Sequence, residues 1–498
     1  MSDYLHGAYG QIQAVGTRVA DDSQGAIVYI GTAPVNQVEG GAKNVNKPIV
    51  VRNMAEARKY FGYSEDWASF TLCEAMHVHL ENKGVGPLIL INVLDPATHK
   101  AASKTTKSLT PSGGRIVITE AEKIYLDSVE VKTTGEDPVT KVKGTDYSIA
   151  YNADKEQIVI QERTSGALGS DALSVSYDVV TPASVTDATV IGSSDGLGLN
   201  TGIFAVKSVY ALTGYIPAYL AAPGFSSVPA VHEALRQNSV KINGHWDAWM
   251  FVDIPITHSG TAITLATAET WRQTNGYICE NETVYFPLAK GIDGKVYHIS
   301  VLAAANFQEL LLGQDGIPWR TASNTPCEVI ENLYLGESNT GRVYDDEIIN
   351  RYLNKNGIAS AAYTGGRWAI WGCRSADYSQ ENADYINAAE TNRMMLFYLS
   401  NDFQHRRSSD VDKPMTRNDL DGIVAEEQAR LDALMKIGAL TYGEVHVNAT
   451  AEELSDIMQG DYSFTFNVTT TPLAKSLTAI VNWTDDGFVT YFATDSAA

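Results

Sequence analysis

The chain has 498 residues, more than one hydrophobic core usually serves, so two or three domains are expected. Its net charge of -22 argues against direct binding of nucleic acid, because a grip on the phosphate backbone rests on clustered Lys and Arg. The four cysteines lie far apart, without the spacing of a zinc site or a redox pair. The start lacks the pattern of a secretion signal and no apolar run reaches membrane-spanning length, so we expect a protein that is made and kept in the cytosol, or leaves it by lysis, without membrane insertion.

The N-terminal segment, residues 1–20, contains one alternating stretch that predicts a strand. Ile12 and Ala14 alternate with Gln11 and Gln13, between Tyr9 and Arg18. No partner strand is adjacent in sequence, so this strand must pair at long range, either within the subunit or across a subunit boundary.

Residues 21–99 predict the first part of an α/β core. An apolar strand at residues 26–31 is followed by Asn53, an N-cap residue with Glu56 three positions on, which indicates a helix start. A second helix is expected at residues 66–82, and an apolar strand at 87–94. Strand, helices, strand is the order of a parallel sheet with both faces covered.

Residues 100–193 show only strands and turns and predict an inserted all-β domain of the sandwich or barrel type. We expect its strands at residues 114–119, 123–132, 147–151, 157–161 and 173–180. A Gly-rich stretch, residues 192–200, reads as the linker that returns to the core.

Residues 194–460 predict the second part of the core. Helices are expected at residues 203–212, from 230, and at 264–275, 346–356, 382–401 and 417–437, with strands at 218–221, 247–253 and 367–373. The predicted fold class is therefore α/β: an interrupted α/β core with an inserted all-β domain and extended β-strand arms at both termini.

The C-terminal segment, residues 461–498, predicts further strands. Phe464, Phe466 and Val468 share one face of the first, while Leu477, Val481 and Trp483 alternate after Pro472. Asp486-Gly487 suggests a hairpin turn, with a return strand from Phe488 to Phe492. These strands either close a sheet within one subunit or pair with another subunit.

Motifs of catalysis and metal binding have weak support. A G-x-S-x-G pattern at residues 192–196 lies in the predicted linker rather than in a strand-to-helix turn. Residues 291–295 lack the spacing of a phosphate loop and predict a hairpin turn instead. Asp419 and Asp421 resemble part of a calcium loop, but the other acidic ligands that such a loop needs are missing. We interpret the two residues instead as acids at a helix N-terminus, where they are favoured by the helix dipole.

The histidines and the basic cluster likewise give weak support for a metal site or a binding site. His77 and His79 lie two apart on a predicted helix, so they point to different faces and do not share a metal. The cluster at residues 405–407 either docks an acidic partner or ends the preceding helix, the interpretation that we favour. We assign no catalytic, cofactor-binding or metal-binding residue.

The chain resembles the tail sheath proteins of contractile phages and related contractile injection particles. Residues 4–10, 30–34, 193–196, 301–305, 317–324, 367–374 and 382–398 carry the resemblance, which covers nearly the whole chain outside the insertion. Cys373 and the segment 303–316 depart from the usual family pattern.

The resemblance implies a structural protein, not an enzyme, that needs no cofactor. Subunits of this family stack as sixfold rings around a tail tube in a metastable extended state and contract to drive the tube through a cell envelope. Baseplate and tail-terminator proteins are the implied further partners. The place is the virion tail or contractile particle, assembled in the bacterial host cytoplasm.

In such an assembly the terminal strands are donated to neighbouring subunits. The implied inter-subunit strands contain Tyr9, Ile12, Ala14, Val15, Phe464, Phe466, Val468, Leu477, Val481, Trp483, Phe488 and Phe492. The implied hinges are Asp21, Asp22 and Ser23 at one end and Gly460 and Asp461 at the other. The alternatives are an α/β hydrolase-like enzyme with an accessory β domain, or a surface-lattice or adhesin protein.

Overall fold

The computed structural model describes residues 18–19, 24–336, 342–378, 384–448 and 454–492. The chain divides into two compact units, Met1–Met415 and Thr416–Ala498, which are described separately below. The predicted arm residues Tyr9, Ile12, Ala14 and Val15 and the predicted hinge Asp21–Ser23 lie outside the described residues.

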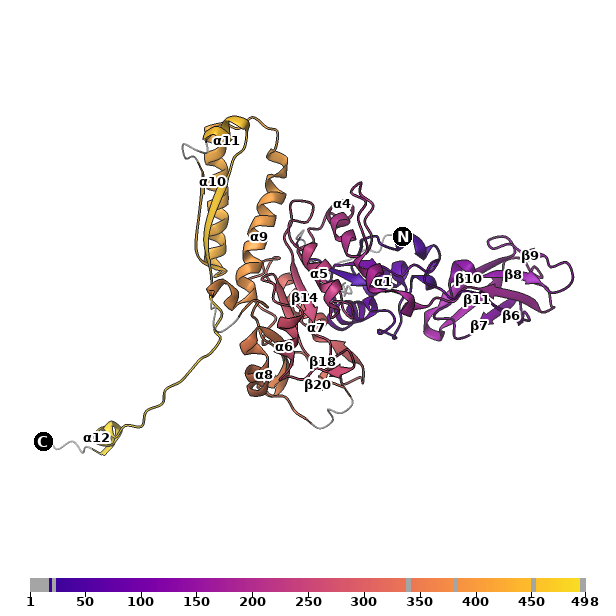
Figure 1. The fold of residues 1–498 in the computed structure, drawn as a ribbon, viewed down its shortest axis with the longest axis horizontal. Helices are drawn as coiled ribbons and strands as arrows, with labels where there is room; N and C mark the ends of the chain where they lie inside the picture. Colours follow the sequence, from indigo (N-terminus) through magenta and orange to yellow (C-terminus); the bar gives the residue numbers. More distant parts are fainter. Residues whose placement is uncertain (1–17, 20–23, 337–341, 379–383, 449–453, 493–498) are drawn as a thin grey trace, which may run out of the picture. The chain divides into compact units, whose positions relative to one another are not determined.

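The first unit is built on an eight-stranded sheet in the order β22-β21-β17-β14-β13-β2-β5-β3. Figure 1 labels one of its central strands, β14. The six central strands are parallel, and β3 and β22 are antiparallel edges. Their bounds are β2 Ile27–Gly31, β3 Ile49–Val51, β5 Leu88–Asn92, β13 Tyr219–Ala221, β14 Trp249–Asp253, β17 Glu282–Tyr285, β21 Ile358–Thr364 and β22 Arg367–Trp371.

The sheet joins two stretches of chain that are far apart in sequence. β2 pairs with β5 on one side and with β13 on the other, and the register places Ile27 opposite Tyr219. Every residue of β2, β5, β13 and β14 is buried, which explains why their sequences are continuous apolar runs without alternation. Residues before and after the segment 100–193 therefore form one core.

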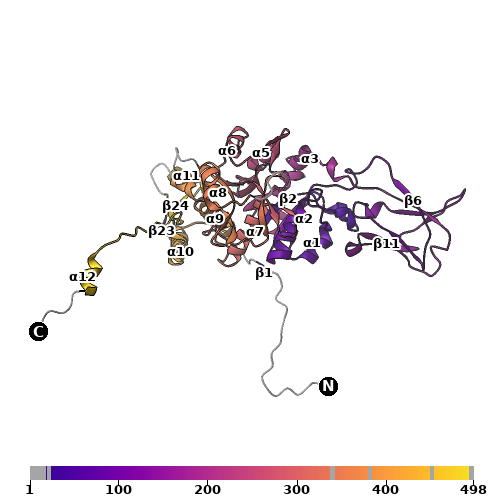
Figure 2. The same ribbon diagram turned by 90° about the horizontal axis from the view of Figure 1, so that it is seen from below.

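Helices cover both faces of this sheet (Figure 2). The crossover from β2 to β5 carries α1 (Met54–Phe61), α2 (Leu72–Ala75) and the π-helical segment η3 (Met76–Lys83). The crossovers from β13 through β14 to β17 step the other way along the sheet and carry α5 (Pro229–Gln237) and α6 (Ala268–Thr274). Because parallel crossovers are right-handed, opposite steps place the helices on opposite faces. The buried helix α7 (Ile299–Leu312) packs against η3.

The first helix confirms its predicted cap, whereas the second begins later than predicted. The Asn53 side chain accepts the N–H of Glu56, and the Glu56 carboxylate accepts the N–H of Arg52. The helix predicted at residues 66–82 starts only at Leu72. Side chains satisfy the backbone before it: Asp66 accepts the N–H of Ser69, so the chain forms turns instead.

Three other helices differ from their expected ranges. The segment expected at 203–212 is a 3-10 helix, η7 (Gly202–Ser208), followed by α4 (Val209–Thr213). The helix expected from 264 is α6, which begins only at Ala268 because the Thr267 hydroxyl accepts the N–H of Thr264 and forms a turn there. The helix expected at 382–401 is α9 (Glu390–Arg407); residues 382–383 lie outside the described part, and Asp384 caps a short 3-10 turn first. Helix α7 was not predicted from the sequence, because it is buried on nearly all sides and its few polar residues do not form a separate solvent face.

Residues 105–177 form two antiparallel sheets, of order β10-β11-β7 and β6-β12-β8-β9. The strands are β6 Thr105–Leu109, β7 Arg115–Ile118, β8 Glu130–Thr133, β9 Thr140–Lys141, β10 Tyr147–Asn152, β11 Gln157–Glu162 and β12 Leu173–Tyr177. They enclose a separate apolar cluster that includes Ile116, Val131 and Ile160. Of the strand predicted at 123–132, only the end is strand, because residues 126–128 form a 3-10 turn.

Smaller elements complete the first unit. β1 (Arg18–Val19) pairs in parallel with β4 (Val85–Gly86). A three-stranded sheet holds β19, β18 and β20, and β15 pairs with β16. Their bounds, with two further helices, are β15 Thr257–His258, β16 Thr261–Ala262, β18 Leu288–Gly291, β19 Val296–His298, β20 Ile330–Tyr334, α3 Asp187–Ile191 and α8 Asp346–Tyr352.

The second unit holds α10 (Arg417–Lys436), the two-stranded antiparallel sheet of β23 (Leu440–Val447) and β24 (Phe464–Thr470), and the short helices α11 (Leu454–Gln459) and α12 (Asp486–Phe492). Asp419 accepts the N–H of Thr416, and Thr416 accepts the N–H of Asp419, a reciprocal cap that starts α10. Among the described residues, none of the helices combines the length and apolar character needed to cross a bilayer.

Candidate functional site

The C-terminal arm, defined here as residues 471–492, differs from the predicted hairpin. After β24 the chain continues without regular structure to Asp485 and then forms α12 (Figure 1). The prediction of paired strands at Leu477–Trp483 and Phe488–Phe492 is therefore wrong for this chain by itself. A hairpin alone is marginal in water, and the Thr484 hydroxyl instead accepts the N–H of Asp486 at the start of α12.

The arm carries large apolar side chains in solvent. Leu477, Ile480, Val481 and Trp483 are 81–91% exposed. Trp483 is the one exposed tryptophan of the eight in the chain, all of which lie in the described residues. Folded chains rarely leave such a series uncovered, and Trp is enriched at interfaces. The arm therefore has the composition of a segment that becomes buried on assembly.

The strand of Phe464, Phe466 and Val468 pairs within its own subunit. It is β24, and its partner is β23, with Val445 opposite Phe466 and Gly443 opposite Val468. The alternative of a sheet closed within one subunit thus holds for this strand, whose partner β23 was not predicted from the sequence. Because β24 already pairs with β23, it does not need a strand of another subunit to form its backbone hydrogen bonds.

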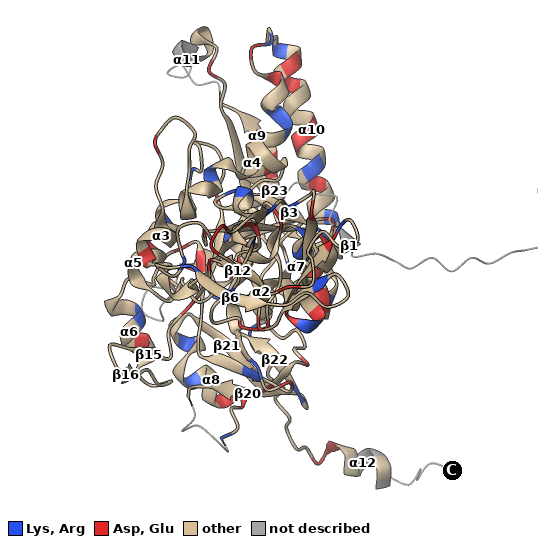
Figure 3. Ribbon diagram, turned by 90° about the vertical axis from the view of Figure 1, so that its right-hand side faces the viewer, with Lys and Arg blue, Asp and Glu red and all other residues tan. Residues whose placement is uncertain are grey.

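Helix α10 fixes the sheet of β23 and β24 from one side. The Gln428 amide donates to the carbonyl of Gly443 and accepts the N–H of Val445. A glycine at position 443 also lets Leu431 approach, since an added Cβ would lie 3.1 Å from the Leu431 Cβ. α10 carries Lys and Arg as well as Asp and Glu on its surface (Figure 3), including the pair Arg417–Asp421.

The predicted hinge at Gly460 and Asp461 lies between α11 and β24, with Gly460 at φ 94°. This position is inside the connection from β23 to β24 rather than at the base of the arm. The arm leaves the sheet at Thr471 and Pro472, where the Thr471 hydroxyl donates to the carbonyl of Gly438.

The position at which α/β enzymes bind ligands is filled in this core. The strand order reverses between β2 and β13, and ligands of such sheets bind beyond the carboxyl ends of the strands at this point. Here the Thr32 hydroxyl donates to the carbonyl of Ser69 and accepts the N–H of Thr71, and the Asn92 side chain accepts the N–H of Ala33. Buried side chains therefore occupy the crevice.

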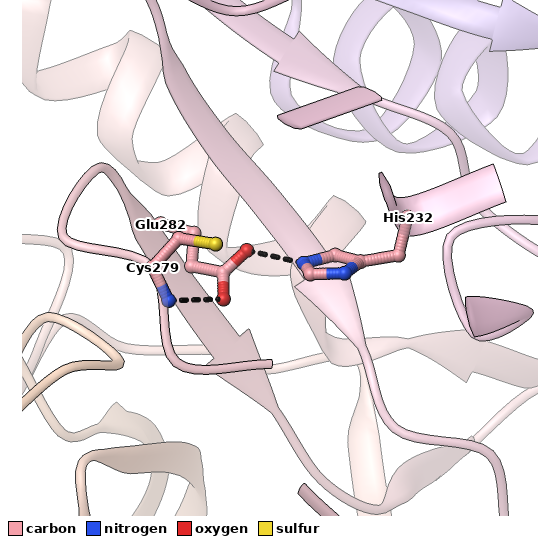
Figure 4. A group of neighbouring side chains, drawn as sticks. All are labelled: His232, Cys279 and Glu282. Atoms are coloured by element: carbon pink, nitrogen blue, oxygen red, sulfur yellow. Dashed lines mark hydrogen bonds and ion pairs between the residues drawn. The ribbon is translucent and has the colours of Figure 1, made fainter. Parts of the chain in front are cut away.

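One group of buried side chains has the composition of a metal site: His232, Cys279 and Glu282 (Figure 4). His232 Nε2 lies 2.6 Å from one Glu282 oxygen, and the other oxygen accepts the N–H of Cys279 at 3.0 Å. His232 also stacks on Tyr277 at 3.9 Å. Burial raises the pKa of the Cys279 thiol, whereas metal binding needs the thiolate. With both carboxylate oxygens already bonded, the group tethers α5 to β17.

The remaining motifs are structural in the positions described. Ser194 of the G-x-S-x-G pattern is in an exposed loop, and residues 292–295 form the turn between β18 and β19, as predicted. His79 is buried against Tyr29 and Gln308, while His77 bonds Glu81, so the two histidines do point to different faces. The basic residues 405–407 form the last turn of α9.

Similarity to known structures runs over nearly the whole chain. The sheath complex of an extracellular contractile injection system, PVC, in the contracted state superposes with a TM-score of 0.53 at 11% identity, covering 98% of each chain. A chain of the anti-feeding prophage baseplate gives a TM-score of 0.53 at 13% identity, covering 97% of this chain and 99% of that one. The sheath tail protein of Desulfitobacterium hafniense gives 0.50 at 10% identity, covering 93% and 100%. The fold is that of contractile sheath subunits.

Sequence similarity supports the same class. The tail sheath protein of Burkholderia phage BcepMu is 26% identical over 497 residues, 96% of each chain, and no family model matches. Over nearly its whole length the chain is therefore similar in sequence to one contractile tail sheath protein and in fold to several, as its resemblance indicated.

Proposed function

We propose that this sheath subunit polymerises by donating its terminal arms to neighbouring copies. The observation that carries the proposal is the C-terminal arm, whose Leu477, Val481 and Trp483 are exposed beyond the last strand of the chain's own sheet. An arm without a fold of its own becomes ordered when it adds a strand to an existing sheet, because the main chain supplies the hydrogen bonds and alternate side chains supply the register.

The acceptor in this proposal is the sheet of β23 and β24. Two strands alone are marginally stable, and three or more are favoured, so an incoming strand stabilises both partners. The alternation of Leu477, Ala479, Val481 and Trp483 fits such an added strand, as does that of Ile12 and Ala14 near the N-terminus. Copies linked in this way form a continuous mesh.

The finer partners follow from the class of protein. We infer sixfold rings stacked around a tail tube, ended by baseplate and tail-terminator proteins, in a virion tail or a related particle assembled in the host cytoplasm. A sixfold-symmetrised baseplate and a sheath in the contracted state among the similar structures support this arrangement.

In this function the free energy for contraction is stored at assembly, and no nucleotide is consumed. The core surfaces slide into larger contact while the donated strands stay paired. The hinges are Asp21–Ser23 at the N-terminal end and, in place of Gly460 and Asp461, Thr471–Pro472 at the base of the arm. The hydrolase alternative is disfavoured because Ser194 is in an exposed loop and the crevice of the core is filled.

Electron microscopy of the purified protein tests this function. We compare the intact chain with deletions of residues 1–18 and 472–498; the second cut preserves β24, which belongs to the chain's own sheet. The matched control removes only residues 493–498. We expect tubular polymers from the intact chain and the control and none from the two arm deletions. Polymers from both deletions, with unchanged dimensions, would contradict arm exchange.

A further inference from the structure

A loop in the first unit presents two leucines to solvent. Leu197 is 92% and Leu199 68% exposed. The loop is nonetheless well fixed: the Asp195 carboxylate accepts the N–H of Leu197 at 2.7 Å and that of Leu199 at 3.0 Å, and Ser194 pairs with Asn200 across its base. We call residues 194–200 the leucine knob. Exposure of apolar side chains to water is unfavourable, and a rigid loop cannot fold them back onto the protein, so they remain exposed unless a partner covers them.

The same unit contains an apolar pocket of about 820 Å³. It lies between η3, α7 and the turn of β18 and β19, with Val78, Leu302, Leu310 and Val329 among its lining side chains. Ile292, which is 71% exposed, lies at the turn, and the ion-paired side chains of Lys83 and Glu309 also line the pocket. The pocket is large enough for two leucine side chains, given that small-ligand pockets measure roughly 300–1,000 Å³.

The knob and the pocket belong to opposite faces of the central sheet. The knob follows α3, which packs against α5 and η7, whereas the pocket is built on η3 and α7 (Figure 2). Two different patches on opposite faces of one subunit make a head-to-tail contact when copies stack, and head-to-tail contacts produce rings or open helical polymers. A sheath is a polymer of this kind.

We propose that the pocket is a docking site for the leucine knob of a second copy of this chain. This inference rests on the proposed polymer and adds a core-to-core contact to the arm exchange. Leu197 and Leu199 of one subunit enter the apolar pocket of the next, with the fixed loop lowering the entropy lost on docking. Around the pocket Asp293, Glu309 and Glu328 outnumber Lys83, and Lys207 on η7 lies next to Ser208, to which Asn200 of the knob is hydrogen-bonded. The knob's own acid, Asp195, directs its carboxylate to the N–H groups of Leu197 and Leu199, so Lys207 is the charge that complements the acidic rim of the pocket.

Cysteine cross-linking in assembled full-length protein tests the contact. Leu199→Cys and Ile292→Cys both replace exposed residues in loops. Because the native Cys327 lines the pocket, every variant also carries Cys327→Ala. The double variant should then give a ladder of cross-linked multimers after mild oxidation, whereas each single variant should stay monomeric on a non-reducing gel. A mixture of the two single variants should give dimers and nothing larger, because each copy then offers one end of a head-to-tail contact. Cross-linking of Leu199→Cys with itself, or none in the mixture, would overturn the proposal.

A second variant keeps the test independent of cross-linking. Leu197→Asp should raise the critical concentration for polymer formation at least about tenfold, since a buried leucine contributes more than a tenfold change in an equilibrium constant. Leu212→Asp on α4, exposed but outside the knob, is the matched control and should change it little. Polymers of Leu197→Asp at the wild-type concentration would refute the knob contact and leave the sheath function standing. Absence of polymers from the unmodified chain would instead contradict the proposed function.

Discussion

Glu74 binds His298 with both of its carboxylate oxygens. One accepts the backbone N–H of His298 at 2.6 Å, and the other lies 2.7 Å from His298 Nδ1. His298 is the residue before α7, and two residues on, the N–H and hydroxyl of Ser300 donate to Asp253 at the end of β14. Two carboxylates thus satisfy the first N–H groups of the central buried helix, an arrangement favoured by the helix dipole.

Removing the charge of Glu74 should loosen this helix start. Glu74→Gln preserves the shape but cannot form a charged pair with His298, so we expect the free energy of unfolding to fall by about 2 kcal/mol. Urea denaturation of the unpolymerised chain measures this change. Glu309→Gln, which breaks only an exposed pair with Lys83, should cost less than about 1 kcal/mol and serves as the control. Equal effects of the two substitutions would show that the buried pair has no special role.

The same pair predicts a dependence of stability on pH. Burial by itself would lower the pKa of His298, but the charge and hydrogen bond of Glu74 outweigh it and raise the pKa to about 9 from 6.5. A raised pKa in the folded state gives stability that is complete below pH 6.5 and is lost as the pH rises through 9. We expect the unfolding midpoint of the wild type to drop over this range more steeply than that of His298→Gln. Parallel curves would contradict the assignment.

Two glycines of the second unit should respond in opposite directions to alanine. Gly422 lies within α10 with open space where a Cβ would be, so Gly422→Ala should stabilise the unit by about 0.5–1 kcal/mol. Gly438 follows the same helix at φ 85°, where alanine is strained, so Gly438→Ala should destabilise it by roughly 1 kcal/mol. Thermal unfolding followed by circular dichroism distinguishes the two. The same sign for both would contradict this account of the helix end.

The group of His232, Cys279 and Glu282 should behave as a hydrogen-bonded tether and not as a metal centre. Addition of zinc or of a chelator is expected to leave the melting temperature unchanged within about 1 °C. Glu282→Gln should lower it, because the substitution weakens the buried bond to His232. Zinc-dependent stabilisation that disappears in Cys279→Ser would reverse this conclusion.

Stiffening the N-terminal hinge should separate assembly from contraction. Proline substitutions at Asp21, Asp22 and Ser23 fix the backbone φ angle but leave the preceding strand intact. We expect sheaths of normal extended length that do not shorten when contraction is triggered, as measured on micrographs. The control carries alanines at the same three positions and should contract. Normal contraction of the proline variant would remove this segment from the hinge.

Elements whose signal is local could be predicted from the sequence, and those that depend on distant partners could not. Asn53 and Glu56 define a helix start by themselves, and the apolar run at β2 needs no context. The helix at 66–82 was predicted too long because Thr32, some 40 positions away, bonds Thr71 and competes with the helix. The hairpin of Leu477 and Trp483 was predicted from alternation alone, which shows that a strand is possible but not which chain supplies its neighbour. The leucine knob was not predicted, because its two leucines are too few to form an apolar pattern in the sequence.

The pairing of Ile27 with Tyr219 also governs how the chain folds. The central sheet cannot close until nearly half of the protein has left the ribosome, so its first strands must wait with their apolar faces exposed. The two antiparallel sheets of residues 105–177 have their own apolar cluster and can fold during this interval. By becoming compact early they shorten the loop that separates β5 from β13, which lowers the entropic cost of bringing the two halves together.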